Sequence, residues 1–236
     1  LSSLVLSGLH RTSREVQKKA QASEQNAGIN INYQSHNKAF RLGANVLYTR
    51  YSQPLIPIER IYNQFEFRGK SNGINSLYFT FNHRNHYFFG ETALSKSGGW
   101  GHVAGIMSSL SRKVDFSMVW RKFDRNFHSF YGNAFSEGSR PINEEGVYLG
   151  LHFIPNRKIS WSAYYDYFKF PWMRFRMYAP STGHEWLNRI TYQPSKQVQV
   201  FFQFREEVKS RNLFSENQFS NQYLLAQGKK SNYVWS

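Results

Sequence analysis

The chain has no cysteine, so disulfide bonds and thiolate metal sites are excluded. It has no run of 18 or more apolar residues, which excludes a transmembrane helix. No secretory signal is recognisable, because residues 1–9 lack a basic beginning and run into polar sequence. From these absences we expect a mature chain or an internal fragment of a longer polypeptide.

Acidic residues are scarce as well: 15 Asp and Glu stand against 30 Lys and Arg, and the formal net charge is +15. A basic excess of this size attracts polyanions such as lipopolysaccharide phosphates, acidic lipid headgroups or nucleic acid. The basic residues are spread along the chain rather than clustered in one tract, which favours a lipid surface over nucleic acid.

Aromatic residues are abundant, at 18% of the chain, although the mean hydropathy is polar at −0.61. This combination fits a sheet with one face toward lipid and the other toward water, with rings in girdles at both interfaces. The alternative, in which rings and basic residues of 168–176 stack on single-stranded nucleic acid, explains fewer of the ring clusters. The girdle is predicted to contain Tyr87, Phe88, Tyr165, Tyr167, Phe170 and Trp172.

Apolar and polar residues alternate with a period of two along the chain, which predicts β-strands. The clearest strands are predicted at 29–33, 40–49, 77–82, 114–121, 147–153, 159–167 and 198–205, and weaker ones at 61–69, 87–94, 103–110, 174–179 and 185–192. Several runs reach the nine or more residues of a tilted transmembrane strand, whereas soluble strands centre on about five to six. Length therefore favours a barrel over a β-sandwich, which would also alternate.

The predicted fold class is all-β: a transmembrane, antiparallel, up-and-down β-barrel in which about 10–12 strands are visible, as a complete barrel or as part of a larger one. Residues 1–236 are expected to form one barrel domain or barrel fragment. Short connections at 155–158 and 194–196 alternate with long ones at 53–60, 125–146 and 211–221, and the turn at 155–158 is predicted to face the periplasm. A short loop helix is predicted at 11–22, because Thr12 and Glu15 have capping-box spacing.

Charged residues give the polar candidates. In the long loop, Arg140 with Glu144 or Glu145 would form a ligand site or gate, but a structural ion pair is the favoured reading. Glu91 and Asp166 fall within strands, where an ionised group on a lipid face costs too much, so both are expected to point inward. Their expected partners are lumen bases such as Arg121 or Arg205.

No catalytic or cofactor pattern emerges, and we expect a non-enzyme without a cofactor. Serine, histidine and asparagine are present, but no spacing defines a nucleophile with its base. His83 and His86 are expected on opposite faces of a strand–turn segment, which argues against a shared metal.

An ordered set of short motifs resembles a known group of proteins. The segments 89–93, 131–137, 155–158, 170–172 and 179–183 carry FGETA, YGNAFSE, PNRK, FPW and APSTG. This set resembles large outer-membrane β-barrel proteins of Bacteroidota that are often labelled helix-hairpin-helix domain proteins, and the resemblance covers about the whole chain. It implies a barrel in the outer membrane; the helical DNA-binding module of the label is not found in this sequence.

The expected function is a non-enzymatic bacterial outer-membrane barrel that acts as a channel or as part of an envelope transport or secretion assembly. The expected partners are outer-membrane lipids, lipopolysaccharide and other envelope proteins. Two alternatives remain: a barrel that handles nucleic acid in DNA uptake, and a membrane-embedded hydrolase.

Overall fold

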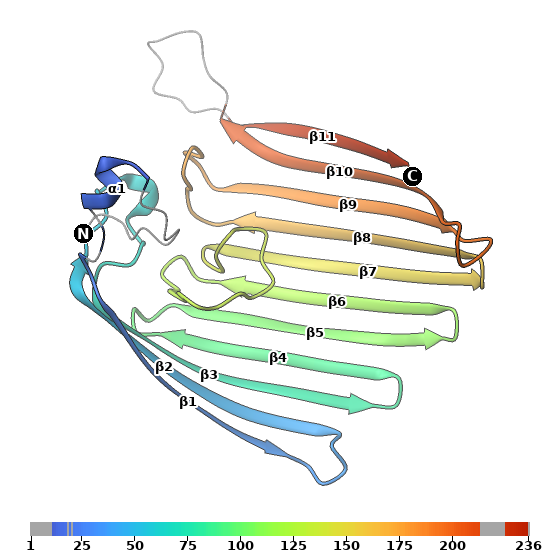
Figure 1. Cartoon of the computed structure of the whole chain (residues 1–236), viewed down its shortest axis with the longest axis horizontal. Coiled ribbons are helices and arrows are strands. Elements are labelled where there is room, and N and C mark those ends of the chain that lie inside the picture. The colour runs from blue at the N-terminus through green and yellow to red at the C-terminus, as the bar shows by residue number, and fades with distance from the viewer. Residues whose placement is uncertain (1–10, 18, 20, 213–224, 236) are drawn as a thin grey trace.

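The computed structural model describes residues 11–17, 19, 21–212 and 225–235. Eleven strands form one antiparallel sheet in which each strand pairs with the next in sequence, so the all-β, up-and-down prediction is confirmed (Figure 1). The described strands form a single sheet, so the β-sandwich alternative is wrong. The strands are β1 (Glu24–Gln34), β2 (Phe40–Leu55), β3 (Gly69–His83), β4 (His86–Ser95), β5 (Trp100–Ser111), β6 (Val114–Phe123), β7 (Glu144–Asn156), β8 (Ile159–Phe170), β9 (Ser181–Tyr192), β10 (Val200–Asn212) and β11 (Leu225–Trp235).

Closure of the barrel is not observed. The sheet order is linear, and among the described residues β1 and β11 are edges that do not pair with each other. The strands are nevertheless long, from 10 residues in β4 to 16 in β2. They exceed the usual length of soluble strands and reach the length that a tilted membrane strand needs.

Helix is limited to two short elements in the described part of the chain, α1 (Ser13–Gln17) and the 3-10 turn η1 (Ile61–Asn63). Neither has the length and apolarity of a membrane-spanning helix. The capping box is present, because Thr12 Oγ1 accepts from the Glu15 amide at 3.3 Å and Glu15 Oε2 accepts from the Thr12 amide at 3.1 Å. The helix is shorter than the predicted 11–22, since it carries no apolar face to pack.

Two predicted strands are wrong. Residues 61–69 form a loop up to the start of β3, because the Asn63 side chain bonds the Arg60 amide and the Ile58 carbonyl and so fixes a turn. Residues 174–179 form only an isolated bridge between Arg174 and Met177. Conversely, the sequence did not predict β11, whose alternation is weak.

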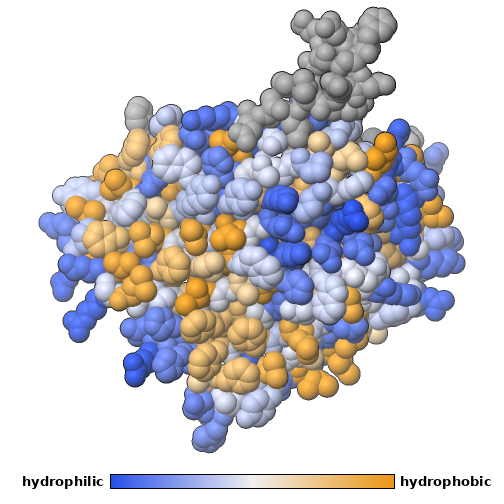
Figure 2. Space-filling view, turned by 180° about the vertical axis from the view of Figure 1, so that it is seen from behind, coloured by the Kyte–Doolittle hydropathy of each residue, from blue (hydrophilic) through white to orange (hydrophobic). Residues whose placement is uncertain are grey.

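The two faces of the sheet differ in chemistry. One face, called here the apolar face, carries side chains such as Ile31, Leu77 and Phe202, which are 68%, 63% and 49% exposed. Figure 2 views the molecule from behind and shows broad hydrophobic patches there. The opposite face, called the loop face, carries polar ladders: Asn30 Nδ2 donates to Asn45 Oδ1 at 2.6 Å, and Asn45 donates to Ser76 at 3.0 Å.

The connections also separate by length, with long ones at one end of the strands and short turns at the other (Figure 1). The long connections are 56–68, 124–143 and 171–180, and the short turns are 35–39, 84–85, 112–113, 157–158 and 193–199. The alternation of long and short connections was predicted from the sequence. The connection between β4 and β5, residues 96–99, is an exception because it lies at the long-loop end yet is short.

The loop of residues 124–143 crosses the loop face. Tyr131 accepts a hydrogen bond from Asn26 of β1 at 2.9 Å, while Glu137 forms an ion pair with Lys209 of β10. In a flat sheet, β1 and β10 would lie about 43 Å apart, whereas the main chain from Tyr131 to Glu137 extends to about 21 Å at most. The sheet therefore curls around this loop, and long side chains cover the remaining span.

Candidate functional site

The loop face carries a fully buried guanidinium, that of Arg121 on β6. Its Nε donates to Glu144 Oε1 at 2.6 Å, and its two terminal nitrogens donate to the Asp166 carboxylate at 2.8 and 3.1 Å. The side chains of Arg121 and Glu144 are 0% exposed. The ring of Phe135 covers the guanidinium at 5.0 Å from its carbon to the ring centroid. Three adjacent strands, β6, β7 and β8, thus share one buried ion network.

Glycine at position 146 makes this network possible. Gly146 lies opposite Arg121 in the register, and a Cβ there would come within 2.6 Å of Arg121 Cζ and 2.9 Å of the Tyr167 carbonyl oxygen. The guanidinium therefore occupies the space that a side chain on β7 would fill.

Glu144 also holds the long loop. Its Oε1 accepts from the Glu137 amide at 2.8 Å, and its Oε2 accepts from the Gly138 amide at 2.9 Å. Burial raises the pKa of the Glu137 carboxyl above its ordinary value, although the Lys209 ammonium opposes this shift. The network on the strands and the conformation of the loop are therefore coupled through one carboxylate.

A second set of charges continues across β8, β9 and β10. Arg205 binds Glu185 through two hydrogen bonds of 2.8 and 2.5 Å, and Tyr164 donates a short hydrogen bond to the same carboxylate. Lys209 contacts Glu207 at 2.9 Å as well as Glu137 of the loop. The loop face is therefore a continuous array of paired charges on this side of the sheet.

Of the polar residues predicted from the sequence, the structure brings Asp166, Arg121 and Glu144 together and places Arg205 in a separate ion pair. Asp166 points to the loop face and pairs with Arg121, one of the two bases expected for it, while Glu144 joins them. Arg205 pairs with Glu185, a residue that sequence reasoning missed. Period-two alternation could have found it, because Glu185 and Arg189 share one face of the strand while Trp186 and Ile190 lie on the other.

The other charged candidates match their predictions only in part. Arg140 forms an ion pair with a carboxylate, as favoured, but its partner is Glu66 of the 56–68 connection rather than Glu144 or Glu145, through two hydrogen bonds of 3.0 and 2.5 Å. Glu145 lies on the apolar face near Lys122, at 3.8 Å, because it alternates with Glu144. Glu91 points to the loop face, as expected, but it is exposed there, and no ion pair joins it to Arg121, Arg205 or another base within the described residues.

Only three of the six residues predicted for the aromatic girdle lie on the apolar face. Phe88, Tyr165 and Tyr167 lie on the apolar face, each about two-fifths exposed. Tyr87 projects to the loop face, because neighbours on a strand point to opposite sides. Phe170 is 2% exposed beneath the loops, and Trp172 packs edge to face on Phe65.

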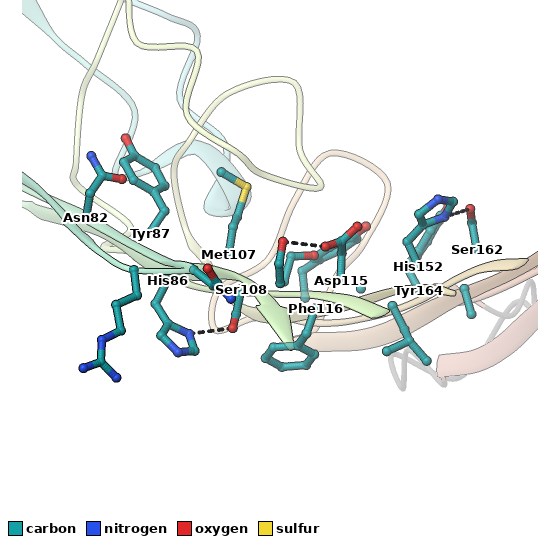
Figure 3. Close-up of a pocket in the computed structure, with 18 residues that line it drawn as sticks. Asn82, His86, Tyr87, Met107, Ser108, Asp115, Phe116, His152, Ser162 and Tyr164 are labelled. Atoms are coloured by element: carbon teal, nitrogen blue, oxygen red, sulfur yellow. Dashed lines mark hydrogen bonds between the residues drawn. The ribbon is translucent and has the colours of Figure 1, made fainter. Parts of the chain in front are cut away.

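A hollow of about 920 Å³ lies at the short-turn end of the sheet. Figure 3 shows Tyr87, Met107, Asp115 and His152 on one side of the sheet and His86 on the other. His152 Nδ1 contacts Ser162 Oγ at 2.8 Å, and Asp115 lies opposite His152 in the register.

This row of serine, histidine and aspartate on three strands is not a catalytic triad. Asp115 accepts from Ser109 at 2.7 Å, and no hydrogen bond joins it to His152 among the described residues. Without an orienting carboxylate on the imidazole, the pair lacks the arrangement that activates a serine.

The histidines at 83 and 86 lie differently from their prediction. A two-residue turn joins β3 and β4, so His83 and His86 are cross-strand partners on the same face. They do not form a metal site: within the part of the chain that the structure describes, no group of three or more His, Asp or Glu residues has a metal-binding arrangement.

The topology gathers basic residues that the sequence disperses. Every short turn carries an exposed Lys or Arg and none carries an acidic residue. These residues are Lys38, Arg84, Arg112, Lys113, Arg157, Lys158 and Lys196. The turn end is therefore uniformly basic, and its residues come from five separate segments.

No family model, curated protein or solved structure matches this chain.

Proposed function

We propose that the sheet is part of the wall of a bacterial outer-membrane β-barrel, with the apolar face toward lipid and the loop face toward a hydrated interior. One observation carries this proposal. Large apolar side chains on the apolar face, among them Leu42, Leu77 and Phe202, stay about half exposed over most of the sheet, while the charged network is confined to the other face. A water-soluble protein rarely leaves so extensive an apolar surface uncovered.

The chemistry of the interior favours passage or assembly over catalysis. Arg121, Arg205 and Lys209 are each paired with carboxylates, and the long loop narrows the space on the loop face. A channel whose interior is constricted by a folded loop, or a component of an envelope assembly, fits this arrangement. The Glu206–Lys229 ion pair of 2.7 Å lies on the apolar face near the β11 edge, and this margin fits contact with protein better than contact with lipid.

Single-cysteine scanning tests the orientation directly, because these 236 residues contain no cysteine. Nitroxide labels at Met118 and Leu42, on the apolar face, are expected to collide with dissolved oxygen in native membranes. Labels at their neighbours Ser117 and Arg41, on the loop face, are expected to collide with a water-soluble nickel chelate. Equal access of nickel to both members of each pair would refute the proposal, as would exclusion of both reagents from the apolar face.

A second candidate is a barrel that handles nucleic acid, and the basic turn end favours it. Binding of a single-stranded oligonucleotide to the purified protein should then weaken as salt rises, with a log–log slope of about −0.7 per phosphate contacted. Absence of salt-sensitive binding would remove this candidate.

A further inference from the structure

Three long connections meet at the long-loop end and enclose a cavity of about 400 Å³. They are residues 56–68, 124–143 and 171–180, so the cavity is built from segments far apart in the sequence. Its walls are aromatic, and three guanidinium groups line it: Arg125, Arg140 and Arg174. A volume of this size falls within the range of about 300–1,000 Å³ typical of small-molecule sites.

Two of the guanidinium groups stack on the faces of aromatic rings. Arg125 lies over the ring of Phe65 at 4.1 Å and near Trp172 at 5.5 Å, and these two rings pack edge to face. Arg174 lies over Phe170 at 3.3 Å. Stacking uses the flat faces of a guanidinium and leaves its N–H edges available to accepting groups.

These edges lack internal acceptors. Neither Arg125 nor Arg174 has a carboxylate within ion-pair distance in the described part of the chain, and Arg174 Nε is buried with no hydrogen-bond partner. Burial lowers the pKa of the Arg174 guanidinium, and Glu144 and Glu137 oppose this only from a distance. A buried donor without an acceptor is energetically costly, so binding of a ligand that supplies an acceptor oxygen would be favourable.

The third guanidinium shows which chemistry the cavity accepts. Arg140 binds the Glu66 carboxylate through two hydrogen bonds of 3.0 and 2.5 Å. The lining of the cavity therefore contains one carboxylate, which is paired with Arg140, and the positive charges of Arg125 and Arg174 have no carboxylate partner there.

We propose that this cavity binds an oxyanion of the phosphate type, held by the N–H edges of Arg125 and Arg174. The oxyanion is free phosphate or the phosphate of a lipid headgroup; both offer the same acceptor oxygens, and guanidinium forks match them.

Titration calorimetry on the purified protein in a zwitterionic detergent tests the site with two probes, inorganic phosphate and dihexanoyl phosphatidic acid. Saturable binding of inorganic phosphate indicates a free anion, whereas binding of the lipid probe alone indicates a headgroup. Arg125→Gln and Arg174→Gln are each expected to weaken binding about tenfold or more, because a charge-assisted bond is lost. Arg189→Gln is the matched control, since Arg189 also stacks on a ring, Phe201 at 4.0 Å, but outside the cavity.

A gain in affinity separates binding from misfolding. Glu66→Gln removes the internal carboxylate, frees Arg140 and should tighten phosphate binding several-fold. Arg125→Lys should weaken binding less than Arg125→Gln, because the charge stays while the fork is lost. The proposal is overturned if neither probe binds, if Arg189→Gln weakens binding as much as the cavity variants, or if Glu66→Gln leaves affinity unchanged or lower.

Discussion

Arg121 and Lys122 are neighbours in sequence whose side chains lie in opposite environments. Arg121 is buried and satisfies two carboxylates, while Lys122 lies on the other face, 3.8 Å from Glu145, with nearly half of its side chain exposed. These two positive charges, although consecutive in sequence, should therefore contribute very differently to the free energy of unfolding.

Arg121→Gln should lower the free energy of unfolding by about 3–5 kcal/mol, because it leaves Glu144 and Asp166 without their cation. Lys122→Gln should change it by less than about 1 kcal/mol, as for other exposed pairs. Urea titration in detergent micelles, followed by tryptophan fluorescence, measures both. Equal effects of the two variants would show that the network does not stabilise the sheet.

The burial of His128 predicts that the stability of the protein depends on pH. Its Nε2 contacts the Phe65 carbonyl at 2.8 Å, its Nδ1 is buried without a partner, and burial lowers the pKa of the imidazole below 6.5. The unfolded state then binds the proton more readily than the folded state. Stability should therefore be full above pH 6.5 and fall as pH drops below it toward the folded pKa.

The variant His128→Gln should lose this component of the pH dependence in urea titrations between pH 5 and 8. His36→Gln, in an exposed turn, should keep the wild-type profile. A wild-type profile in His128→Gln would assign the dependence to another group.

At the scale of elements, β7 and the 124–143 loop depend on each other through Gly146 and Glu144. The turn at 157–158 on the opposite end is held by the backbone bond of the Lys158 carbonyl with the Gln193 amide at 2.7 Å and by Asn156 Oδ1 with the Lys158 amide at 2.9 Å, without a buried ion network. The long loop therefore behaves as part of the sheet rather than as an appendage.

Gly146→Ala should displace the Arg121 guanidinium and destabilise the protein by about 1–3 kcal/mol through overpacking. Hydrogen exchange should accelerate at the Glu137 and Gly138 amides, because their acceptor is Glu144. Gly73→Ala is the control, since its Cβ would meet Tyr48 only at 3.9 Å. Unchanged hydrogen exchange in Gly146→Ala would show that the conformation of the 124–143 loop does not depend on the Arg121 network.

Much of the element pattern was predictable, because alternation reports the faces of long strands whatever their neighbours are. The ion pair of Arg121 with Asp166 also followed from charge inside a strand. The partners Glu66 and Glu137 did not, since loop residues have no period and their contacts depend on how connections fold over the sheet. The error at His83 and His86 came from neglecting that a two-residue turn sets positions three apart on one face.

At the scale of the whole molecule, charge is polarised along the strands. The charged residues of the short turns are all basic, whereas the long connections 56–68 and 124–143 carry charges of both signs. Basic residues that are dispersed in the sequence thus form one basic rim at the short-turn end of the sheet, and their even spread along the chain did not indicate this.

Neutralising Arg112, Lys113, Arg157 and Lys158 to glutamine should reduce the anionic lipid that co-purifies with the protein, and low salt should accentuate the loss. Native mass spectrometry of the protein released from mixed anionic and zwitterionic nanodiscs measures this. The matched control neutralises Arg60, Arg68, Lys96 and Arg176 at the long-loop end. Equal losses would show that lipid retention follows total charge rather than the rim.

The linear order of the eleven strands has a consequence of parity. Neighbours are antiparallel throughout, so β1 and β11 run in the same direction. Joining these edges would place one parallel seam in an otherwise antiparallel wall, and a second copy in the same orientation would repeat the mismatch, because it also contributes eleven. A seamless ring requires an even total. For the proposed barrel, closure between β11 and β1 would therefore take an odd number of further strands, and this restricts which segments could complete the ring.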